Sequence, residues 1–299
     1  TASAPVRSIT THVWDGFVQS HVCSSNGYSA GWNRTSFGMG GEITLEDEGD
    51  RLPEAYDYRS ARHASDLPSN EQLAKSLLRR GRTRLGSHKI ASARMPLLLE
   101  NRAAARLINT LIGPLKGQSI YEQRSCLQNK LNAHIAATNL TITDNPLLSR
   151  GLASRPYDSD GFPSQPRSII KDGILQMYFI NQYNARRLNM AVTTGSSSNL
   201  VIAPSESSPT ELLSVLPQAI CVEGFLGGNT NPITGDFSFG IHGRYYEYGE
   251  FVQGVSEMNL SGNLLDLLKK FQGAADDVWM YSSYRMPSLL FDDMQFSGS

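Results

Sequence analysis

The amino-acid sequence predicts an α+β fold in which mainly antiparallel sheets, barrel-like or layered, pack against several helices. Three observations lead to this prediction. Segments of alternating apolar and polar residues are joined by short turns, amphipathic helical segments carry capping residues, and the two kinds of segment do not alternate regularly along the chain. Regular βα alternation would instead predict a parallel sheet, so strand pairs mixed with helices favour antiparallel pairing.

Strands are expected where apolar and polar residues alternate or where apolar residues run together. Residues 12–23 and 36–45 alternate and should pair through the turn between them, while residues 94–100 form an apolar strand. Asp172–Gly173 and Tyr248–Gly249 each separate two strand-like runs, which predicts a tight hairpin at each place. Antiparallel strand pairs should therefore dominate the sheets.

Helices are expected where apolar residues recur every three or four positions after a capping residue. The first helix should start after Ser69, which forms a capping box with Gln72, and should end at Gly81. The second, residues 101–117, is expected to kink or end at Gly113–Pro114, because proline lacks the N–H donor. Further helices are predicted at residues 181–190, 208–216 and 261–273, the last with Leu264, Leu265, Leu268 and Phe271 facing inward.

A basic run covers the end of the first predicted helix and comprises Arg79, Arg80, Arg82, Arg84 and Lys89. It could contact nucleic acid or an acidic partner. The favoured interpretation is a solvated helix end, since basic side chains are stabilised there by the helix dipole. The net charge of −1 gives the whole chain no general attraction to nucleic acid or to an anionic membrane.

Cysteine usage and hydropathy indicate the environment. Cys23, Cys126 and Cys221 are far apart and lack CxxC spacing, so we expect neither a disulfide framework nor a zinc cluster, and each thiol should be a small buried hydrophobe. No segment approaches the roughly 20 consecutive apolar residues that a membrane span needs. The expectation is a cytoplasmic protein without membrane contact.

Residues 223–243 are rich in glycine and could form a phosphate loop, a metal site or a turn-rich bridge between strands. The spacings of the phosphate-binding motifs are missing, and the histidines of the chain are isolated, so the bridge is favoured. Asp158, Asp160 and Asp236 lie close to glycines; they could orient a substrate or a partner's cation, but turn formation is the favoured role. These residues alone identify no catalytic centre.

An ordered series of motifs extends from the middle of the chain to its end: RSCLQNKL (124–131), ITDNPLLSRGLASRPYDSDG (142–161), RSIIKDGIL (167–175), YNARRLNM (183–190), TTGSSSN (193–199), NPITGDFSFGIHG (231–243), VSEMNLSGNLLDLL (255–268) and MPSLLFDDMQFSG (286–298). In this order they resemble the TldD/PmbA family, and more closely its PmbA branch, also called TldE. The resemblance implies that residues 1–299 are the family's C-terminal region, with possible sub-parts 1–100 and 101–299. On this resemblance, we expect these residues not to include the family's N-terminal domain.

What the resemblance implies about function is a heterodimeric metallopeptidase. Its TldD-type subunit carries an HExxxH helix and a C-terminal cysteine for zinc, whereas the PmbA-type subunit lacks these ligands. In this sequence Asn109 and Pro114 stand where the two histidines would be, and Thr110 replaces the glutamate. We therefore expect no catalytic residue, no metal and no other cofactor in this chain, with zinc in a TldD-type partner.

The leading hypothesis is a non-metal subunit that pairs with a TldD-type zinc peptidase in the proteolysis of unfolded peptides or small proteins, as in peptide maturation or antitoxin turnover. The alternative is a self-associating, homodimeric peptide-binding or scaffold protein. The weaker alternative is a modulator of DNA gyrase. Residues that could face a substrate cleft are Asn231, Asp236, Ser238 and His242, and Arg186 and Arg187 could hold a substrate carboxylate or pair with Asp158.

Overall fold

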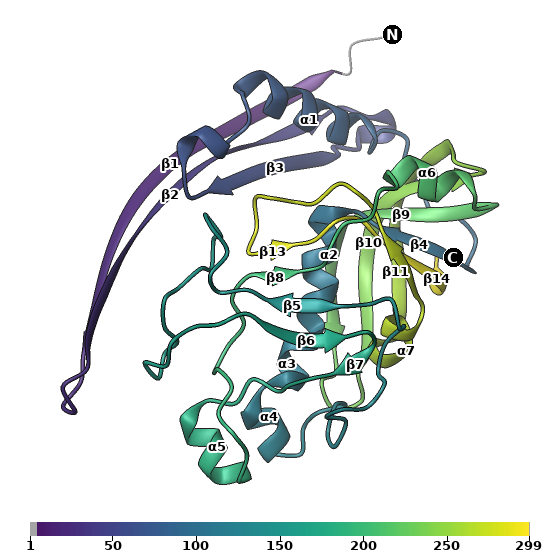
Figure 1. Ribbon diagram of the computed structural model, residues 1–299. Helices are drawn as coiled ribbons and strands as arrows, with labels where there is room; N and C mark the ends of the chain where they lie inside the picture. Colours follow the sequence, from purple (N-terminus) through teal and green to yellow (C-terminus); the bar gives the residue numbers. More distant parts are fainter. Residues whose placement is uncertain (1–4, 299) are drawn as a thin grey trace.

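The computed structural model describes residues 5–298. Five of its strands form a ring, which lies at the right in Figure 1. The strands lie in the order β11-β10-β9-β4-β14, and β14 pairs again with β11, which closes a barrel. Among these pairs only β4 with β9 is parallel, so the predicted α+β fold with a mainly antiparallel, barrel-like sheet is confirmed. The bounds are β4 (Ala93–Leu99), β9 (Gln218–Thr230), β10 (Asp236–Glu247), β11 (Glu250–Asn263) and β14 (Leu289–Ser297), and β12 (Phe271–Ala274) extends the sheet beside β14.

Both predicted hairpins are confirmed by their backbone conformation. Tyr248 (φ 49°) and Gly249 (φ 81°) join β10 to β11. Asp172 (φ 51°) and Gly173 (φ 78°) join β6 (Arg167–Lys171) to β7 (Ile174–Leu175). Two successive positive φ values match the twist of a tight antiparallel pair, which is why these residue pairs mark the turns.

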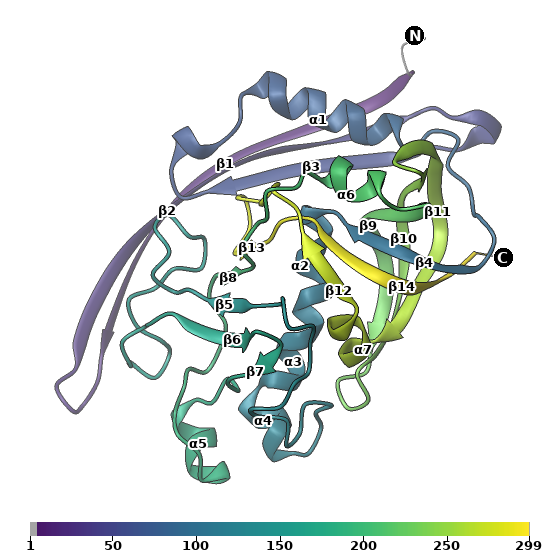
Figure 2. The same ribbon diagram turned by 45° about the vertical axis from the view of Figure 1, so that its right-hand side comes forward.

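A long hairpin projects from the body of the molecule (Figures 1 and 2). Its strands are β1 (Val6–Cys23) and β2 (Ser29–Leu45), which confirms the predicted strand pair with an earlier start, and β3 (Glu54–Ala61) covers only residues 37–44 of β2. We call residues 16–36 the arm. Near its tip the ring of Tyr28 lies 5.9 Å from that of Tyr157, whose hydroxyl donates to the backbone oxygen of Ala30.

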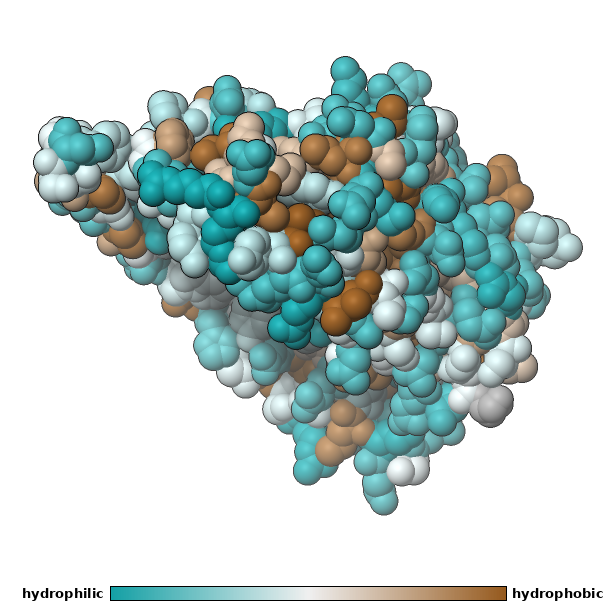
Figure 3. All heavy atoms as spheres, turned by 90° about the horizontal axis from the view of Figure 1, so that it is seen from below, coloured by the Kyte–Doolittle hydropathy of each residue, from teal (hydrophilic) through white to brown (hydrophobic). Residues whose placement is uncertain are grey.

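The arm exposes large apolar side chains along β1. Phe17 is 64% exposed and Val22 is 44% exposed, although a strand in a core would bury every second residue. Figure 3, viewed from below, shows the arm as a narrow projection at the left on which apolar and hydrophilic residues mix. β1 is also the edge strand of its three-stranded sheet. The arm therefore combines exposed apolar side chains with an unpaired strand edge.

Helix α1 (Asn70–Arg82) lies on the three-stranded sheet, and the capping box between Ser69 and Gln72 is confirmed. The prediction that Gly81 ends this helix is wrong, because the helix continues to Arg82. Gly81 is buried against the sheet, and a Cβ there would lie 3.0 Å from Leu45. Glycine at this position thus allows the helix to approach the sheet closely. It does not serve as a left-handed C-cap.

Helix α2 (Asn101–Ile108) begins directly after β4 and continues through a 3-10 turn (Asn109–Leu111) into α3 (Ile112–Leu115). The helical run ends one residue after Pro114, as predicted, because Lys116 is extended. Its fully buried side chains, Leu107, Leu111 and Leu115, recur every four residues. α2 and α3 therefore turn one apolar face to the core and leave the opposite face for polar residues.

A second small sheet lies beside this helical run in the order β13-β8-β5-β6-β7. Its further strands are β5 (Ile142–Asp144), β8 (Leu200–Val201) and β13 (Tyr284–Arg285). The remaining helices are α4 (Gly117–Tyr121), α5 (Gln182–Leu188), α6 (Pro209–Ser214) and α7 (Leu264–Lys269), with 3-10 turns at Glu48–Asp50 and Ala64–Asp66. Within residues 5–298, none of the helices is long and apolar enough to cross a membrane.

The last predicted helix is too long. We expected it to run over residues 261–273, but α7 ends at Lys269, and Phe271 belongs to β12, where it pairs with Phe291 of β14. The apolar residues beyond the helix are buried as a strand. Backbone hydrogen bonds to β14 therefore prevail over the helical spacing of the sequence.

Candidate functional site

Two neighbouring cavities lie along the polar face of α2 and α3. The first, which we call the arginine cavity, has a volume of about 320 Å³ and is lined by Arg80, Arg84, Arg102, Arg106, Glu223 and His242, among others. The second, the Asn109 cavity, has a volume of about 420 Å³, and its lining includes Asn109, Thr110, Pro114, Lys116 and Phe239. Arg106 lines both, so the two form one candidate site.

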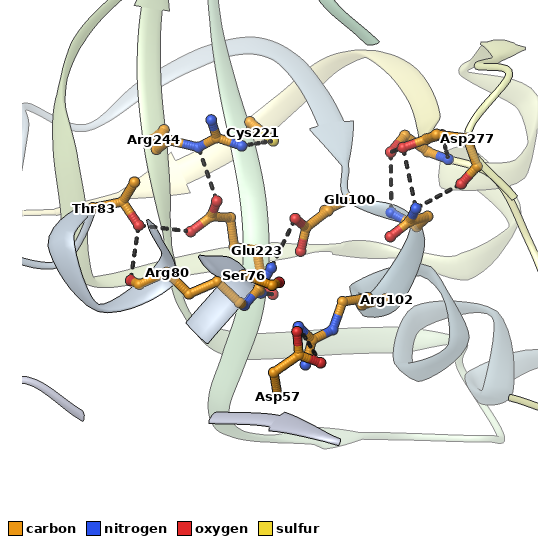
Figure 4. A network of polar contacts seen from close by, with 12 residues as sticks. Asp57, Ser76, Arg80, Thr83, Glu100, Arg102, Cys221, Glu223, Arg244 and Asp277 are labelled. Atoms are coloured by element: carbon orange, nitrogen blue, oxygen red, sulfur yellow. Dashed lines mark hydrogen bonds and ion pairs between the residues drawn. The ribbon is translucent and has the colours of Figure 1, made fainter. Parts of the chain in front are cut away.

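A network of buried charges supports the arginine cavity (Figure 4). Arg80 from α1 pairs with Glu100, which precedes α2, at 2.9 Å, and Arg244 from β10 pairs with Glu223 from β9 at 2.9 Å. In Figure 4 Glu223 points between Arg244 and the end of α1, where Thr83 lies. Because buried charges are tolerated only when they are paired, this network fixes α1 against the barrel.

Asp57 of β3 ties the three-stranded sheet to α2. Its fully buried carboxylate accepts hydrogen bonds from Arg59 at 2.8 and 2.7 Å and lies 3.2 Å from the guanidinium of Arg102. Burial by itself would raise the pKa of Asp57, but the hydrogen bonds from Arg59 and the charge of Arg102 lower it below its ordinary value. Asp57 is therefore ionised and bridges two arginines.

The arginine cavity is crowded with positive charge. Burial and the nearby Arg80 lower the pKa of Arg102 to about 10, and the same two causes lower the pKa of Arg84. His242 is buried, and its Nε2 contacts the guanidinium of Arg84. Burial and the charges of Arg84 and Arg80 lower the pKa of His242 to about 3, so its imidazole is neutral near pH 7.

The interpretation of the basic run as a solvated helix end is wrong for two of its members. Arg80 is buried in its pair with Glu100, and Arg84 is half-buried beside His242. The cause is the direction of α1, whose last turn faces the barrel and its carboxylates. The other members, Arg79, Arg82 and Lys89, are exposed, as that interpretation expects.

Two residues of the Asn109 cavity form hydrogen bonds with residues outside its lining. Asn109 is exposed, and its Oδ1 accepts a hydrogen bond from the hydroxyl of Tyr284 at 2.5 Å. The hydroxyl of Thr110 donates to the backbone oxygen of Leu107, one helical turn back. Pro114 is buried. Asn109 and Thr110 thus have structural partners, and Pro114 contributes by packing.

Of the four candidates from the glycine-rich segment, His242 alone lines one of these two cavities. Asn231 and Asp236 close the turn between β9 and β10: the Oδ1 of Asn231 accepts from the backbone of Ile233, and Asp236 accepts from Thr234. Ser238 is exposed on β10. The favoured turn role of Asp236 agrees with these contacts, and a cleft role for it stays a prediction.

Arg186 and Arg187 lie on α5, away from both cavities. The guanidinium of Arg187 stacks on Tyr121 at 3.6 Å from the ring centroid, and Arg186 is exposed. Asp158 instead accepts the backbone N–H groups of Asp160 and Phe162, each at 3.0 Å, in a turn. Within residues 5–298 neither arginine forms an ion pair with Asp158, whose Oδ1 serves the local turn. A role of Arg186 and Arg187 in holding a substrate carboxylate stays a prediction.

Residues 92–298 match the family model of the PmbA/TldA metallopeptidase C-terminal domain. The chain belongs to the PmbA/TldD family. It is 32% identical over 277 residues to the metalloprotease PmbA of Escherichia coli O157:H7, covering 92% of this chain and 61% of that protein. The PmbA homolog of Haemophilus influenzae is 31% identical over 253 residues, covering 84% of this chain and 56% of its own length. The chain thus spans less than two thirds of these relatives.

Solved structures show the same PmbA/TldD fold. A Bacteroides thetaiotaomicron protein proposed as a modulator of DNA gyrase superimposes with a TM-score of 0.96 at 34% identity, covering 100% of this chain and 68% of its own. TldE from Thermococcus kodakarensis superimposes with a TM-score of 0.85 at 19% identity, covering 95% and 68%. The second likeness concerns the fold alone.

The metal that this metallopeptidase family implies does not fit the residues of the Asn109 cavity. Zinc takes imidazole, thiolate or carboxylate ligands, whereas Asn109 and Thr110 offer an amide and a hydroxyl, and Pro114 offers no ligating side-chain atom. No cluster of three or more His, Cys, Asp or Glu residues that could hold a metal ion occurs within residues 5–298. We therefore derive no chemical step through a metal in this chain.

Sequence reasoning missed the acidic residues of the network, Asp57, Glu100 and Glu223. One signal was available: Glu223 interrupts the otherwise apolar run of β9, and a charged residue in a buried strand is expected to have a partner. The expectation of buried thiols holds for Cys221, whose pKa burial raises to about 12, but is wrong for the exposed Cys23. Cys23 lies at the end of β1 in the exposed arm.

The turn role of Asp236 gives a first prediction. Asp236→Ala should lower the unfolding midpoint, because its carboxylate accepts hydrogen bonds from Thr234 and Asn263 that hold the turn. These hydrogen bonds also lower the pKa of Asp236 below its ordinary value. Thermal unfolding of the variant should be compared with that of Ser238→Ala, which removes an exposed hydroxyl from the same strand. An unchanged midpoint in Asp236→Ala would contradict the turn role.

Proposed function

We propose that this chain is the non-metal subunit of a peptidase pair in which a TldD-type partner supplies the zinc site. The observation that carries the proposal is the trio Asn109, Thr110 and Pro114 in a metallopeptidase family. These residues retain a cavity on the helical run but provide neither a zinc ligand nor a general base. The role left to the chain is to bind and position an unfolded peptide in the cytoplasm.

The test separates the chain from its complex. Zinc content and cleavage of an unfolded polypeptide should be measured for the isolated chain, for a cognate TldD-type subunit and for their mixture. We expect cleavage and stoichiometric zinc in the mixture, and neither in the isolated chain. Stoichiometric zinc or cleavage in the isolated chain would contradict the proposal.

A matched variant sharpens this test. The triple change Asn109→His, Thr110→Glu and Pro114→His places imidazoles five residues apart on the helical run, with a glutamate beside the first. If the missing ligands alone account for the absence of a metal site, this variant should gain zinc affinity measurable by competition with a chelator. The control is Lys116→His, which adds one imidazole at the exposed edge of the same cavity.

The second candidate is a homodimeric peptide-binding or scaffold protein, and the arm is the observation that favours it. The edge of β1 could add a strand from a second chain or a peptide by main-chain hydrogen bonds. Light scattering would distinguish the two functions: a dimer of this chain that excludes the TldD-type subunit favours the scaffold. A gyrase modulator is the weaker alternative, because Arg80 of the basic run is buried and cannot reach a DNA phosphate.

A further inference from the structure

The walls of the arginine cavity carry four arginines and one glutamate. The carboxylates in and around the cavity already form ion pairs with arginines. Glu100 pairs with Arg80, Asp57 serves both Arg59 and Arg102, and Glu223 pairs with Arg244. In the part of the chain that the structure describes, neither Arg84 nor Arg106 has a carboxylate partner; Arg84 donates to the backbone oxygen of Glu54, and Arg106 lies over the ring of Phe239. Two cationic groups of the cavity thus form no ion pair among the described residues.

His242 adds a donor to the same wall. Arginine has only donors, so the contact between Arg84 and the Nε2 of His242 requires that Nε2 accept. In the neutral imidazole the proton then resides on Nδ1. This N–H is buried and has no hydrogen-bond partner within residues 5–298. An unpaired buried donor beside unpaired arginines favours an acceptor from outside the chain.

The arginine cavity has an exposed and a buried part. Tyr56 is 49% exposed, and Arg106 and Gly227 are exposed, whereas Arg80, Ala103 and His242 are buried. A ligand group that enters past the exposed residues would meet buried arginine and histidine groups inside. Beyond Arg106 lies the larger Asn109 cavity, where Phe239 and Ile112 add apolar surface. The site suits an elongated ligand with an anionic end.

We propose that the arginine cavity binds the C-terminal carboxylate of a peptide, with the preceding residues over Arg106 and in the Asn109 cavity. The identification of the ligand as a peptide rests on the proposed function. Guanidinium groups match the two oxygens of a carboxylate, and burial strengthens such charge-assisted hydrogen bonds. A free phosphate would match the arginines but would leave the Asn109 cavity unused, so the chain end of a peptide accounts for both cavities.

The test is calorimetric titration of the chain with N-acetyl-trialanine as the free acid, with its C-terminal amide, and with inorganic phosphate. We expect the free acid to bind roughly 10-fold or more tightly than the amide, since a charged hydrogen-bond acceptor is removed. Arg106→Gln and Arg84→Gln should each weaken the binding of the free acid by a similar factor. Arg82→Gln, which replaces an exposed arginine at the end of α1 that does not line the cavity, should leave the affinity unchanged.

Several outcomes would overturn the proposal: equal affinities of acid and amide, binding of phosphate alone, or an Arg106→Gln variant with unaltered affinity. Arg106 is exposed and forms no ion pair among the described residues, so its replacement should not disturb folding. Because the titration uses the chain alone, it does not depend on a metal-bearing partner. Binding without assembly would refute the proposed function only, whereas cleavage by the pair without carboxylate binding would refute this inference only.

Discussion

Asp57→Ala is expected to lower the free energy of unfolding by about 3–5 kcal/mol, as when one partner of a buried ion pair is removed. Asp57 is fully buried and is the carboxylate between Arg59 and Arg102. Without it, two guanidinium groups stay buried beside each other, and both also lie over the ring of Trp279. Urea unfolding followed by circular dichroism measures the effect.

Two further variants make this prediction specific. Asp15→Ala removes an exposed carboxylate from the same three-stranded sheet and should leave the unfolding free energy almost unchanged. Asp57→Asn keeps the shape and two hydrogen-bonding groups of the side chain but not its charge. Its loss of unfolding free energy should therefore lie between those of Asp57→Ala and Asp15→Ala. If Asp57→Ala were to cost less than about 1 kcal/mol, the ion pair would not be what fixes the sheet to α2.

The free energy of unfolding should fall on acidification because of His242. His242→Gln should remove the part of this fall that His242 causes. The folded chain holds the pKa of His242 at about 3, whereas the ordinary value is 6.5. Below pH 6.5 the unfolded chain binds a proton that the folded chain does not bind, so stability declines until the pH reaches about 3. The slope is about 1.4 kcal/mol per pH unit, or roughly 2 kcal/mol at pH 5.

This prediction is measured as a difference between two proteins. Urea unfolding from pH 7.5 to about 4 should show the curves of the parent chain and His242→Gln approaching each other as the pH falls. Asp57, whose lowered pKa also removes stability at low pH, is present in both chains and cancels in the difference. Parallel curves over this range would show that His242 accepts its proton freely in the folded state.

Local structure was predictable where a few adjacent residues decide it. The capping box at Ser69 and the positive-φ turns at Asp172–Gly173 and Tyr248–Gly249 depend on neighbouring atoms only, and all occur as predicted. Gly81 and the end of α7 were predicted wrongly for the opposite reason. Close packing on Leu45 and pairing with β14 involve residues distant in sequence, which a local pattern does not contain.

Some residues of the candidate site could be predicted from the sequence, whereas their contacts with residues distant in sequence could not. The family resemblance located Asn109, Thr110 and Pro114 on the helical run, and the structure adds that they line a cavity. The sequence offered Glu223 as a buried charge, but the pairs of the network could not be predicted, because they join α1 to the start of α2 and β9 to β10, and no sequence spacing encodes those distances. His242 was selected because its segment is polar among apolar strands, whereas its contact with Arg84 depends on the fold and could not be read from the sequence.

The way the barrel closes also sets the order in which the chain can fold during synthesis. β1 pairs with β2 and β2 with β3, so the three-stranded sheet can form as soon as its own residues have left the ribosome. The ring cannot close at that stage, because β14 is synthesised last. β14 pairs with β4, where Leu289 lies opposite Leu99, and it also pairs with β11. Until then β4 and β11 expose strand edges, so a stalled or prematurely terminated nascent chain would present an open, association-prone barrel.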